Sequence, residues 1–245
     1  MARAYGWRAR IGFVLPANNN VLEPELYSVA PPGVAIHASR MLLGSTVMSA
    51  ETLHAMEQQA DRALAELAET SVDAAVYACL STSLVKGRAW DEAFAQRVQG
   101  QQTLPLATVA AAVVSALRHL GARRIAVASP YPPPIAATVA AYFENWDLIV
   151  VEQAHLPTAD VRSVGDLPAS AAYQLGRAVV RSDCRPDALA ILATDFATFP
   201  VLQALEDDLG CPVVSANQAA LWWALRAAGV QAAVPGLGCL LDPRS

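Results

Sequence analysis

The segment Cys79-Leu80-Ser81-Thr82 places a thiol and two hydroxyl groups directly after an apolar run, Ala74 to Ala78. The run is typical of a buried strand, and the segment is expected to lead into a helix. In α/β proteins ligands bind beyond the carboxyl ends of strands, where the N–H groups of a helix start attract anions and lower a thiol pKa. Cys79 is therefore a candidate nucleophile or proton carrier. The alternative is a packing role, because cysteine is also a common small core residue.

Two asparagines follow other expected strands. Asn19 lies in the triple-asparagine segment after the run Ile11 to Leu15, and Asn217 follows Ser215 near the end of the chain. An amide can bind a carboxylate oxygen, but asparagine also favours turns and helix N-caps. Two roles therefore stay open for each residue: Asn19 binds substrate or forms the turn, and Asn217 contacts substrate or caps the helix Ala219 to Ala228.

The chain contains an apparent internal duplication. Arg10 to Pro16 resembles Arg124 to Pro130, and Asp73 to Cys79 resembles Asp187 to Ala193, both at a spacing of 114 residues. The shared order and spacing favour two copies of one unit, although buried strands of an alanine- and valine-rich chain can look alike. The second copy holds Ala193 or Thr194 where the first holds Cys79, so the thiol lacks a counterpart.

Short apolar runs alternate with helical patterns along the chain, an order that favours parallel sheets covered by helices. The expected strands are Ile11 to Leu15, Val34 to His37, Asp73 to Ala78, Leu104 to Leu106, Arg124 to Ala128, Leu148 to Val151, Ala188 to Ala193 and Pro212 to Val214. The expected helices are Glu51 to Thr70, Val85 to Val98, Val109 to Leu120, Pro134 to Asn145, Ala169 to Arg181, Phe199 to Leu209 and Ala216 to Ala228.

We therefore predict an α/β fold of two pseudo-symmetric, doubly wound halves, each with a four-stranded parallel sheet flanked by helices. The first half comprises residues 1–107 plus 216–245, and the second half comprises residues 108–215. The active site is expected between the halves, at the carboxyl ends of the strands.

Composition excludes several classes of function. The chain has 245 residues, 54% of them hydrophobic, and no apolar run of the ~18 residues that a membrane helix needs. A net charge of −5 without a basic cluster argues against nucleic acid as a partner. The first residues lack the apolar core of a signal peptide, so we expect a cytoplasmic enzyme or binding protein. Small molecules or proteins remain as its partners.

The cysteines and histidines show no metal-binding pattern. Cys79, Cys184, Cys211 and Cys239 are far apart, without a Cys-x-x-Cys pair or a nearby histidine at zinc-ligand spacing. We expect no metal site, and packing roles for Cys184 and Cys211. Arg40 can pair with a substrate carboxylate, or with an acidic residue of the protein itself.

Several segments together resemble the aspartate/glutamate racemase superfamily, and within it most closely the maleate cis-trans isomerases and arylmalonate decarboxylase. The resemblance covers nearly the whole chain. It rests on Arg10 to Asn19, Arg40-Met41, Tyr77 to Leu80, Ser129 to Tyr131, Gly210 to Gln218 and Val234 to Gly238. It implies an enzyme of two related halves that acts on a small dicarboxylate without metal or organic cofactor, and a homodimer.

The resemblance also implies roles for individual residues. Cys79 would be the catalytic thiol of the first half, Asn19 a carboxylate-binding amide and Tyr131 a hydrogen-bond donor to substrate. Ser81 and Thr82 would flank the anion site. The superfamily's racemases and isomerases carry a second cysteine in the other half, and arylmalonate decarboxylase keeps only that second one. This chain has the opposite arrangement.

Because a second thiol is missing, the possible reactions can be ranked by the number of proton carriers that each requires. Racemisation needs a proton carrier on each face of a carbanion, and a threonine hydroxyl is far too weak an acid and base, which disfavours it. Isomerisation by addition and elimination of the Cys79 thiolate needs one nucleophile, and decarboxylation needs one proton donor. Two roles stay open for Asp195, next to Thr194: it replaces the missing acid, or it is an exposed residue or a helix cap. A binding protein without catalytic activity is a further alternative.

Overall fold

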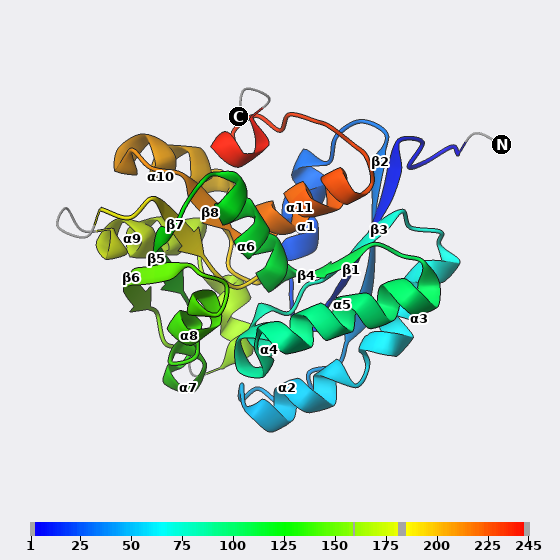
Figure 1. Cartoon of the computed structure of the whole chain (residues 1–245), viewed down its shortest axis with the longest axis horizontal. Helices are drawn as coiled ribbons and strands as arrows, with labels where there is room; N and C mark the ends of the chain where they lie inside the picture. Colours follow the sequence, from blue (N-terminus) through cyan, green and yellow to red (C-terminus); the bar gives the residue numbers. More distant parts are fainter. Residues whose placement is uncertain (1–2, 159, 181–184, 243–245) are drawn as a thin grey trace.

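The structure is a computed structural model that describes residues 3–158, 160–180 and 185–242. It contains two four-stranded sheets with the orders β2-β1-β3-β4 and β6-β5-β7-β8 (Figure 1), and all strand pairs are parallel. The strands are β1 (Ala9–Pro16), β2 (Val34–Met41), β3 (Ala74–Tyr77), β4 (Leu106–Thr108), β5 (Arg124–Ser129), β6 (Ile149–His155), β7 (Ala188–Ile191) and β8 (Val213–Ser215). The predicted fold class is confirmed.

The two halves repeat one hydrogen bond at the spacing of 114 residues. The carboxylate of Asp73 accepts a bond of 2.8 Å from the backbone N–H of Arg10, at the start of the β1–β3 pair. The carboxylate of Asp187 accepts a bond of 2.8 Å from the backbone N–H of Arg124 in the β5–β7 pair. The same side chain therefore ties the same two strands together in each half, as an internal duplication requires.

Helices cover both sheets. They are α1 (Leu22–Val29), α2 (Ala50–Glu57), α3 (Ala60–Glu69), α4 (Leu80–Lys86), α5 (Arg88–Gln102), α6 (Val109–His119), α7 (Pro133–Ala136), α8 (Val139–Glu144), α9 (Ala169–Val179), α10 (Leu202–Leu209) and α11 (Ala216–Ala227). Short 3-10 helices lie at Val161–Asp166, Phe199–Val201 and Cys239–Leu241. The predicted end of the ninth helix, Arg181, lies outside the described residues.

Three predicted helices are interrupted, and one helix, α1, was not predicted. The predicted helix Glu51 to Thr70 divides into α2 and α3 at Gln58 and Gln59, and the Gln59 side chain binds the backbone N–H and C=O of Leu42 at 3.0 and 2.9 Å. The predicted helix Val85 to Val98 is interrupted at Gly87, whose φ of 82° is left-handed and ends α4. Helix α4 begins five residues before the predicted start, and α5 ends four residues after the predicted end. The predicted helix Pro134 to Asn145 likewise divides into α7 and α8.

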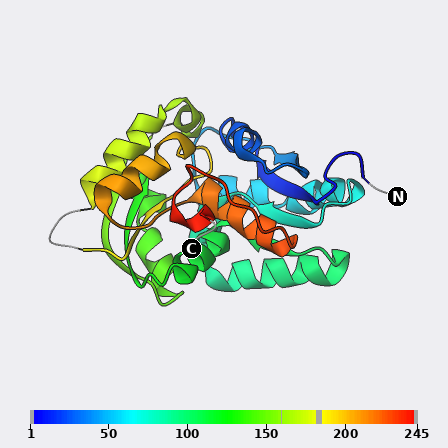
Figure 2. The same ribbon diagram turned by 90° about the horizontal axis from the view of Figure 1, so that it is seen from above.

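Two helices connect the halves in the middle of the molecule (Figures 1 and 2). Helix α11 follows β8 of the second sheet but packs on β1 and β3 of the first, and α6 follows β4 but also contacts β8. The two helices also pack against each other. The predicted boundaries of the halves, after residues 107 and 215, stay a prediction.

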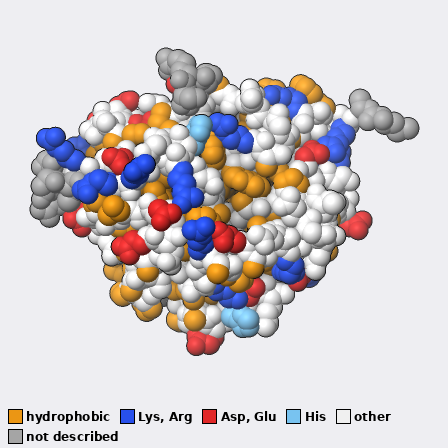
Figure 3. Space-filling model, viewed as in Figure 1, with side chains coloured by type: hydrophobic (Ala, Val, Ile, Leu, Met, Phe, Trp, Pro, Cys, Tyr) orange, Lys and Arg blue, Asp and Glu red, His pale blue; other side chains and the backbone are white. Residues whose placement is uncertain are grey.

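The surface carries mixed charges. On the face shown in Figure 3, Lys and Arg side chains lie among Asp, Glu and hydrophobic side chains. In the part of the chain that the structure describes, none of the helices combines the length and apolarity required to cross a membrane.

Candidate functional site

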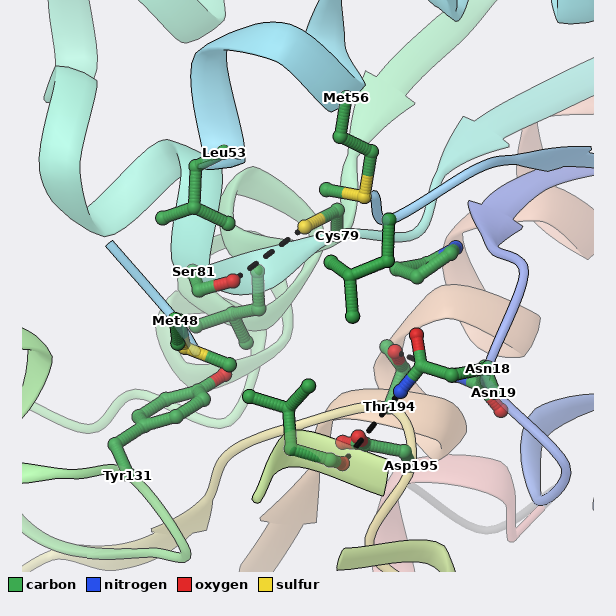
Figure 4. Close-up of a pocket in the computed structure, with 14 residues that line it drawn as sticks. Asn18, Asn19, Met48, Leu53, Met56, Cys79, Ser81, Tyr131, Thr194 and Asp195 are labelled. Atoms are coloured by element: carbon green, nitrogen blue, oxygen red, sulfur yellow. Dashed lines mark hydrogen bonds between the residues drawn. The ribbon is translucent and has the colours of Figure 1, made fainter. Parts of the chain in front are cut away.

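A cavity lies where the carboxyl ends of strands from both sheets meet (Figure 4). Segments after β1, β3, β5 and β7 contribute polar side chains, and the segment between β2 and α3 contributes apolar ones. The lining residues are Pro16, Asn18, Asn19, Leu43, Met48, Leu53, Met56, Cys79, Leu80, Ser81, Tyr131, Val161, Thr194 and Asp195. The structure thus brings six of the eight predicted site residues to one cavity.

Cys79 is buried at the start of α4, with 4% of its surface exposed. Its sulfur lies 3.4 Å from the Ser81 hydroxyl and accepts a hydrogen bond of 3.2 Å from the Thr82 hydroxyl. Burial raises the pKa of the Cys79 thiol, although the bonds from Ser81 and from the side chain and backbone of Thr82 oppose this effect. The helix start lowers this pKa as expected, but the net pKa is raised, because desolvation outweighs the hydrogen bonds.

Ser81 and Thr82 have different positions. Ser81 lines the cavity beside the thiol. Thr82 is fully buried behind it, where its hydroxyl accepts a hydrogen bond of 3.3 Å from Tyr77 and donates to Cys79. Thr82 therefore orients the sulfur from below the cavity surface, and does not border the cavity as the resemblance implied.

Asn19 forms the predicted turn and also lines the cavity. Its Oδ1 accepts hydrogen bonds from the N–H groups of Val21 and Leu22 at 3.1 and 2.9 Å, which forms the turn into α1. Its Nδ2 points to the cavity and donates to Thr194 Oγ1 at 2.9 Å (Figure 4). One amide thus shapes the turn and connects the two halves.

Of the two residues that follow β7 where a second thiol is missing, Thr194 lines the cavity and Ala193 does not. Its hydroxyl donates to the Ala78 carbonyl at 3.0 Å and accepts the bond from Asn19. Ala193 has a φ of 83°, in the left-handed region, so the chain turns at this residue between β7 and Thr194. The Thr194 hydroxyl therefore uses both its donor and its acceptor in hydrogen bonds within the protein.

Asp195 lines the cavity on the side opposite Cys79 (Figure 4). Burial raises the pKa of its carboxyl to about 6, while a bond from its own backbone N–H opposes the rise. Asp195 is not the exposed or capping residue that the sequence favoured. It is an acid inside the site with a pKa close to neutrality.

Tyr131 follows β5 and lies almost fully buried in the cavity wall. Burial and the nearby charges of Asp195 and Cys79 raise the pKa of its phenol well above the usual range. The hydroxyl therefore keeps its proton at neutral pH and can serve only as a hydrogen-bond donor or neutral acceptor. This position fits the donor role that the resemblance implied.

Asn217 lies outside the set of lining residues. Its Nδ2 donates to Glu25 Oε2 at 2.7 Å and to the Thr194 carbonyl at 3.1 Å. It does not cap α11 either, because Ser215 is the N-cap and forms a capping box with Gln218. Asn217 instead positions the backbone of the segment that carries Thr194 and Asp195.

The sequence did not reveal Glu25 as a residue that supports the site. Its Oε1 accepts hydrogen bonds from the N–H groups of Thr198 and Phe199 at 2.6 and 2.8 Å, and its Oε2 binds Asn217. Burial raises the pKa of this carboxyl. The available signal was its place between Leu22 and Leu26 on the apolar side of a short helix, where an acid requires partners.

The polar side of the cavity contains no cationic side chain among the described lining residues. None of the fourteen described lining residues is Arg, Lys or His. Arg40 binds the carbonyl oxygens of Ala17 and Asn19 at 3.1 and 2.7 Å and pairs with Glu23, so it fixes the loop after β1 from outside. An anionic ligand would therefore be held by amide, hydroxyl and backbone N–H groups.

An apolar wall closes the other side of the cavity. Leu53 and Met56 belong to α2, within the predicted helix Glu51 to Thr70, and Met48 precedes α2. Val161 reaches the wall from the second half, and its N–H donates to the Thr46 carbonyl at 3.2 Å. This contact between distant segments leaves no trace in the local sequence.

The remaining cysteines lie away from the cavity. Cys211 and Cys239 are half-buried free thiols, and neither lines the site. Cys184 lies outside the described residues. Within residues 3–158, 160–180 and 185–242, no three His, Cys, Asp or Glu side chains come together as metal ligands would.

Comparisons with known proteins place the chain in a family. A family model described as arylmalonate decarboxylase matches residues 11–241. Maleate isomerase from Nocardia farcinica is 32% identical over 243 residues, which cover 95% of either chain. Arylmalonate decarboxylase from Bordetella bronchiseptica is 33% identical over 180 residues, which cover 69% of this chain and 72% of that protein.

A solved structure adds chemical information. It is a cysteine-to-serine variant of the Nocardia farcinica maleate cis-trans isomerase with a covalently bound succinylcysteine intermediate. This structure matches with a TM-score of 0.89 and 31% identity, over 97% of this chain and 99% of that chain. These matches confirm the predicted resemblance to the racemase superfamily and its maleate isomerases. The chain described here therefore belongs to the arylmalonate decarboxylase family.

Proposed function

We propose that the chain is a cofactor-independent isomerase that converts a small cis-dicarboxylate of the maleate type to its trans isomer, with Cys79 as the nucleophile. One observation carries this proposal. The only described thiol in the cavity lies at the start of α4, beside Ser81 and opposite Asp195, in a fold shared with maleate isomerases. A related enzyme with a succinylcysteine intermediate supports the addition of a thiol to the alkene.

The proposed reaction begins with addition of Cys79 Sγ to one alkene carbon. The double bond becomes a single bond, and rotation about it exchanges the cis for the trans arrangement. Elimination of the thiolate then restores the double bond. Asn19, Tyr131, Ser81 and the N–H groups at the start of α4 would hold the carboxylates and stabilise the negative charge that develops during addition.

Decarboxylation of an arylmalonate is the second candidate, and the apolar wall favours it. Leu43, Met48, Leu53 and Met56 line one side of the cavity and could accommodate an aromatic ring or exclude water from a leaving carboxylate. Cys79 would then protonate the enediolate that remains. Racemisation is not proposed, because Thr194 cannot serve as the second base.

We further propose that the protein acts in the cytoplasm as a homodimer, without metal or organic cofactor, and without membrane or nucleic acid as a partner. The family resemblance supports the dimer and the cofactor-free reaction. Size-exclusion chromatography with light scattering would measure the mass of the assembly in solution.

One assay separates the candidate reactions. The protein is incubated with maleate, phenylmalonate or aspartate in deuterated buffer, and each sample is followed by NMR. Fumarate supports isomerisation, deuterated phenylacetate supports decarboxylation, and α-deuterium exchange of aspartate supports racemisation. Cys79→Ala should abolish turnover, and Cys211→Ser, a thiol outside the cavity, should preserve it. Full turnover by Cys79→Ala would refute the proposal.

A further inference from the structure

The cavity has three titratable side chains among its described lining residues, Cys79, Tyr131 and Asp195. Cys79 follows β3 of the first half, and Asp195 follows β7 of the second half. Their side chains lie on opposite sides of the cavity (Figure 4). The charge of Asp195 acts on both Cys79 and Tyr131, which places the three groups within electrostatic reach of one another.

We propose that Asp195 is the second acid–base group of this site: it accepts the proton that Cys79 loses on addition and then delivers a proton to the substrate carbanion. This inference rests on the proposed function, since it assigns the proton transfers that the function requires. It gives the second half a catalytic residue in place of the absent thiol, one position after Thr194.

The proton and the electrons can be followed through both steps. Cys79 Sγ forms a bond to one alkene carbon, the π electron pair moves to the neighbouring carbon and its carboxylate, and the thiol proton goes to the Asp195 carboxylate. Asp195 then protonates that neighbouring carbon, which yields a succinyl thioether. After rotation, Asp195 removes a proton from the same carbon, its electron pair restores the double bond, and the C–S bond breaks. The proton on Asp195 finally returns to the Cys79 thiolate.

Other groups in the cavity are less suited to this role. The Tyr131 phenol keeps its proton because burial and its two anionic neighbours raise its pKa. The Thr194 hydroxyl is bound to the Ala78 carbonyl and the Asn19 amide. Asn18, Asn19 and Ser81 do not titrate in the relevant range. Asp195 is thus the one acid among the described lining residues that exchanges protons near neutral pH.

Charge balance supports the same assignment. A bound dicarboxylate brings two negative charges into a cavity without a cationic lining residue. A thiolate and an ionised Asp195 would add two more, which a partly buried site does not tolerate. A protonated Asp195 beside the Cys79 thiolate removes one of these charges while addition occurs.

The proposal predicts a bell-shaped pH profile. The reactive pair of a thiolate and a carboxylic acid holds one proton, the same number as a thiol and a carboxylate. Burial raises the pKa of Asp195 to about 6, and the pKa of the Cys79 thiol lies above its usual range. Between these two pH values, Cys79 and Asp195 together hold one proton. The rate should rise with pH through about 6, stay constant, and fall when the second group loses its proton.

Asp195→Asn tests the assignment. The variant should lose about 10²- to 10⁴-fold in turnover at pH 7. Its rate should no longer rise near pH 6 but continue to increase with pH as Cys79 ionises. Thr194→Cys introduced into the Asp195→Asn background should restore part of the activity. Asp147→Asn is the matched control, because the Asp147 side chain is 90% exposed and is not among the residues that line the cavity.

The outcomes distinguish this inference from the proposed function. If the wild type converts maleate and Asp195→Asn keeps the wild-type rate and its rise near pH 6, the inference is overturned while the function stands. If the wild type does not convert maleate, the proposed function fails and the inference fails with it. Loss of the rise near pH 6 in Asp195→Asn, with activity rescued by the new thiol, supports both.

Discussion

Asn19 Nδ2 donates a hydrogen bond of 2.9 Å to Thr194 Oγ1, and this bond joins the two halves at the floor of the site. Thr194 in turn donates to the carbonyl of Ala78, the residue before the reactive thiol. The segment after β7, which lacks a second cysteine, thus holds a threonine that joins the two halves. Proton transfer in the second half is left to its neighbour, Asp195.

Thr194→Val should destabilise the protein. Valine keeps the shape of threonine but leaves the Asn19 amide and the Ala78 carbonyl without a partner in a buried region, which costs about 1–3 kcal/mol. Urea denaturation would measure the change in the free energy of unfolding. Thr138→Val is the control, since that hydroxyl bonds only the Ile135 carbonyl within a partly exposed turn. Equal stability of the two variants would contradict the prediction.

Cys79 should react slowly with iodoacetamide at neutral pH. Burial raises the pKa of this thiol, so the thiolate fraction at pH 7 is smaller than that of a free cysteine. The rate, followed by mass spectrometry of the peptide that contains Cys79, should increase as pH rises above the usual thiol range. Asp195→Asn should shift this increase to lower pH, because the Asp195 charge is one cause of the raised pKa. An unshifted profile would show that the two groups do not interact.

Glu25→Ala should weaken both stability and activity. Without the carboxylate, the N–H groups of Thr198 and Phe199 and the Asn217 amide lose a buried acceptor. We expect a loss of about 2–4 kcal/mol in the free energy of unfolding, together with a lower turnover number, since the segment after β7 is no longer held. Glu69→Ala, an exposed residue at the end of α3, should leave both quantities unchanged.

The ionised Asp195 carboxylate should lower the free energy of unfolding at high pH. Its pKa rises from 3.8 to about 6 on folding, so the folded state binds this proton more tightly than the unfolded state. The resulting stabilisation is complete below pH 3.8 and is lost as pH rises through about 6. Asp195→Asn should therefore be more stable than the wild type at pH 8, by about 3 kcal/mol, and nearly equal at pH 4.

The comparison for this prediction is Asp187→Asn. The N–H groups of Arg123 and Arg124 lower the pKa of Asp187, so its charge stabilises the folded state. Stability from Asp187 is present above the unfolded pKa and is lost as pH falls. Asp187→Asn should therefore be less stable than the wild type at pH 8. If the two variants respond alike in urea titrations at pH 4 and pH 8, the assignment of the raised pKa to Asp195 is wrong.

Much of this molecule is determined locally by the sequence. Apolar runs located all eight strands, because buried strands consist of such residues. Strands β2 and β6, which are only partly buried, extend four residues beyond their predicted ends. The repeat of Asp73 as Asp187 indicated the two halves, and the position of Cys79 after a buried run indicated the chemistry. Each of these signals depends on neighbours in the chain, so no tertiary contact was needed to detect it.

The tertiary structure alone decided which groups meet and in which state. Asn19 and Thr194 are 175 positions apart, and Asn217 turned from a predicted contact or cap into a support for the segment after β7. The raised pKa of Cys79 and of Asp195 arises from burial by both halves at once. Desolvation depends on every atom packed around a group, and those atoms come from segments that are neighbours only after the chain has folded.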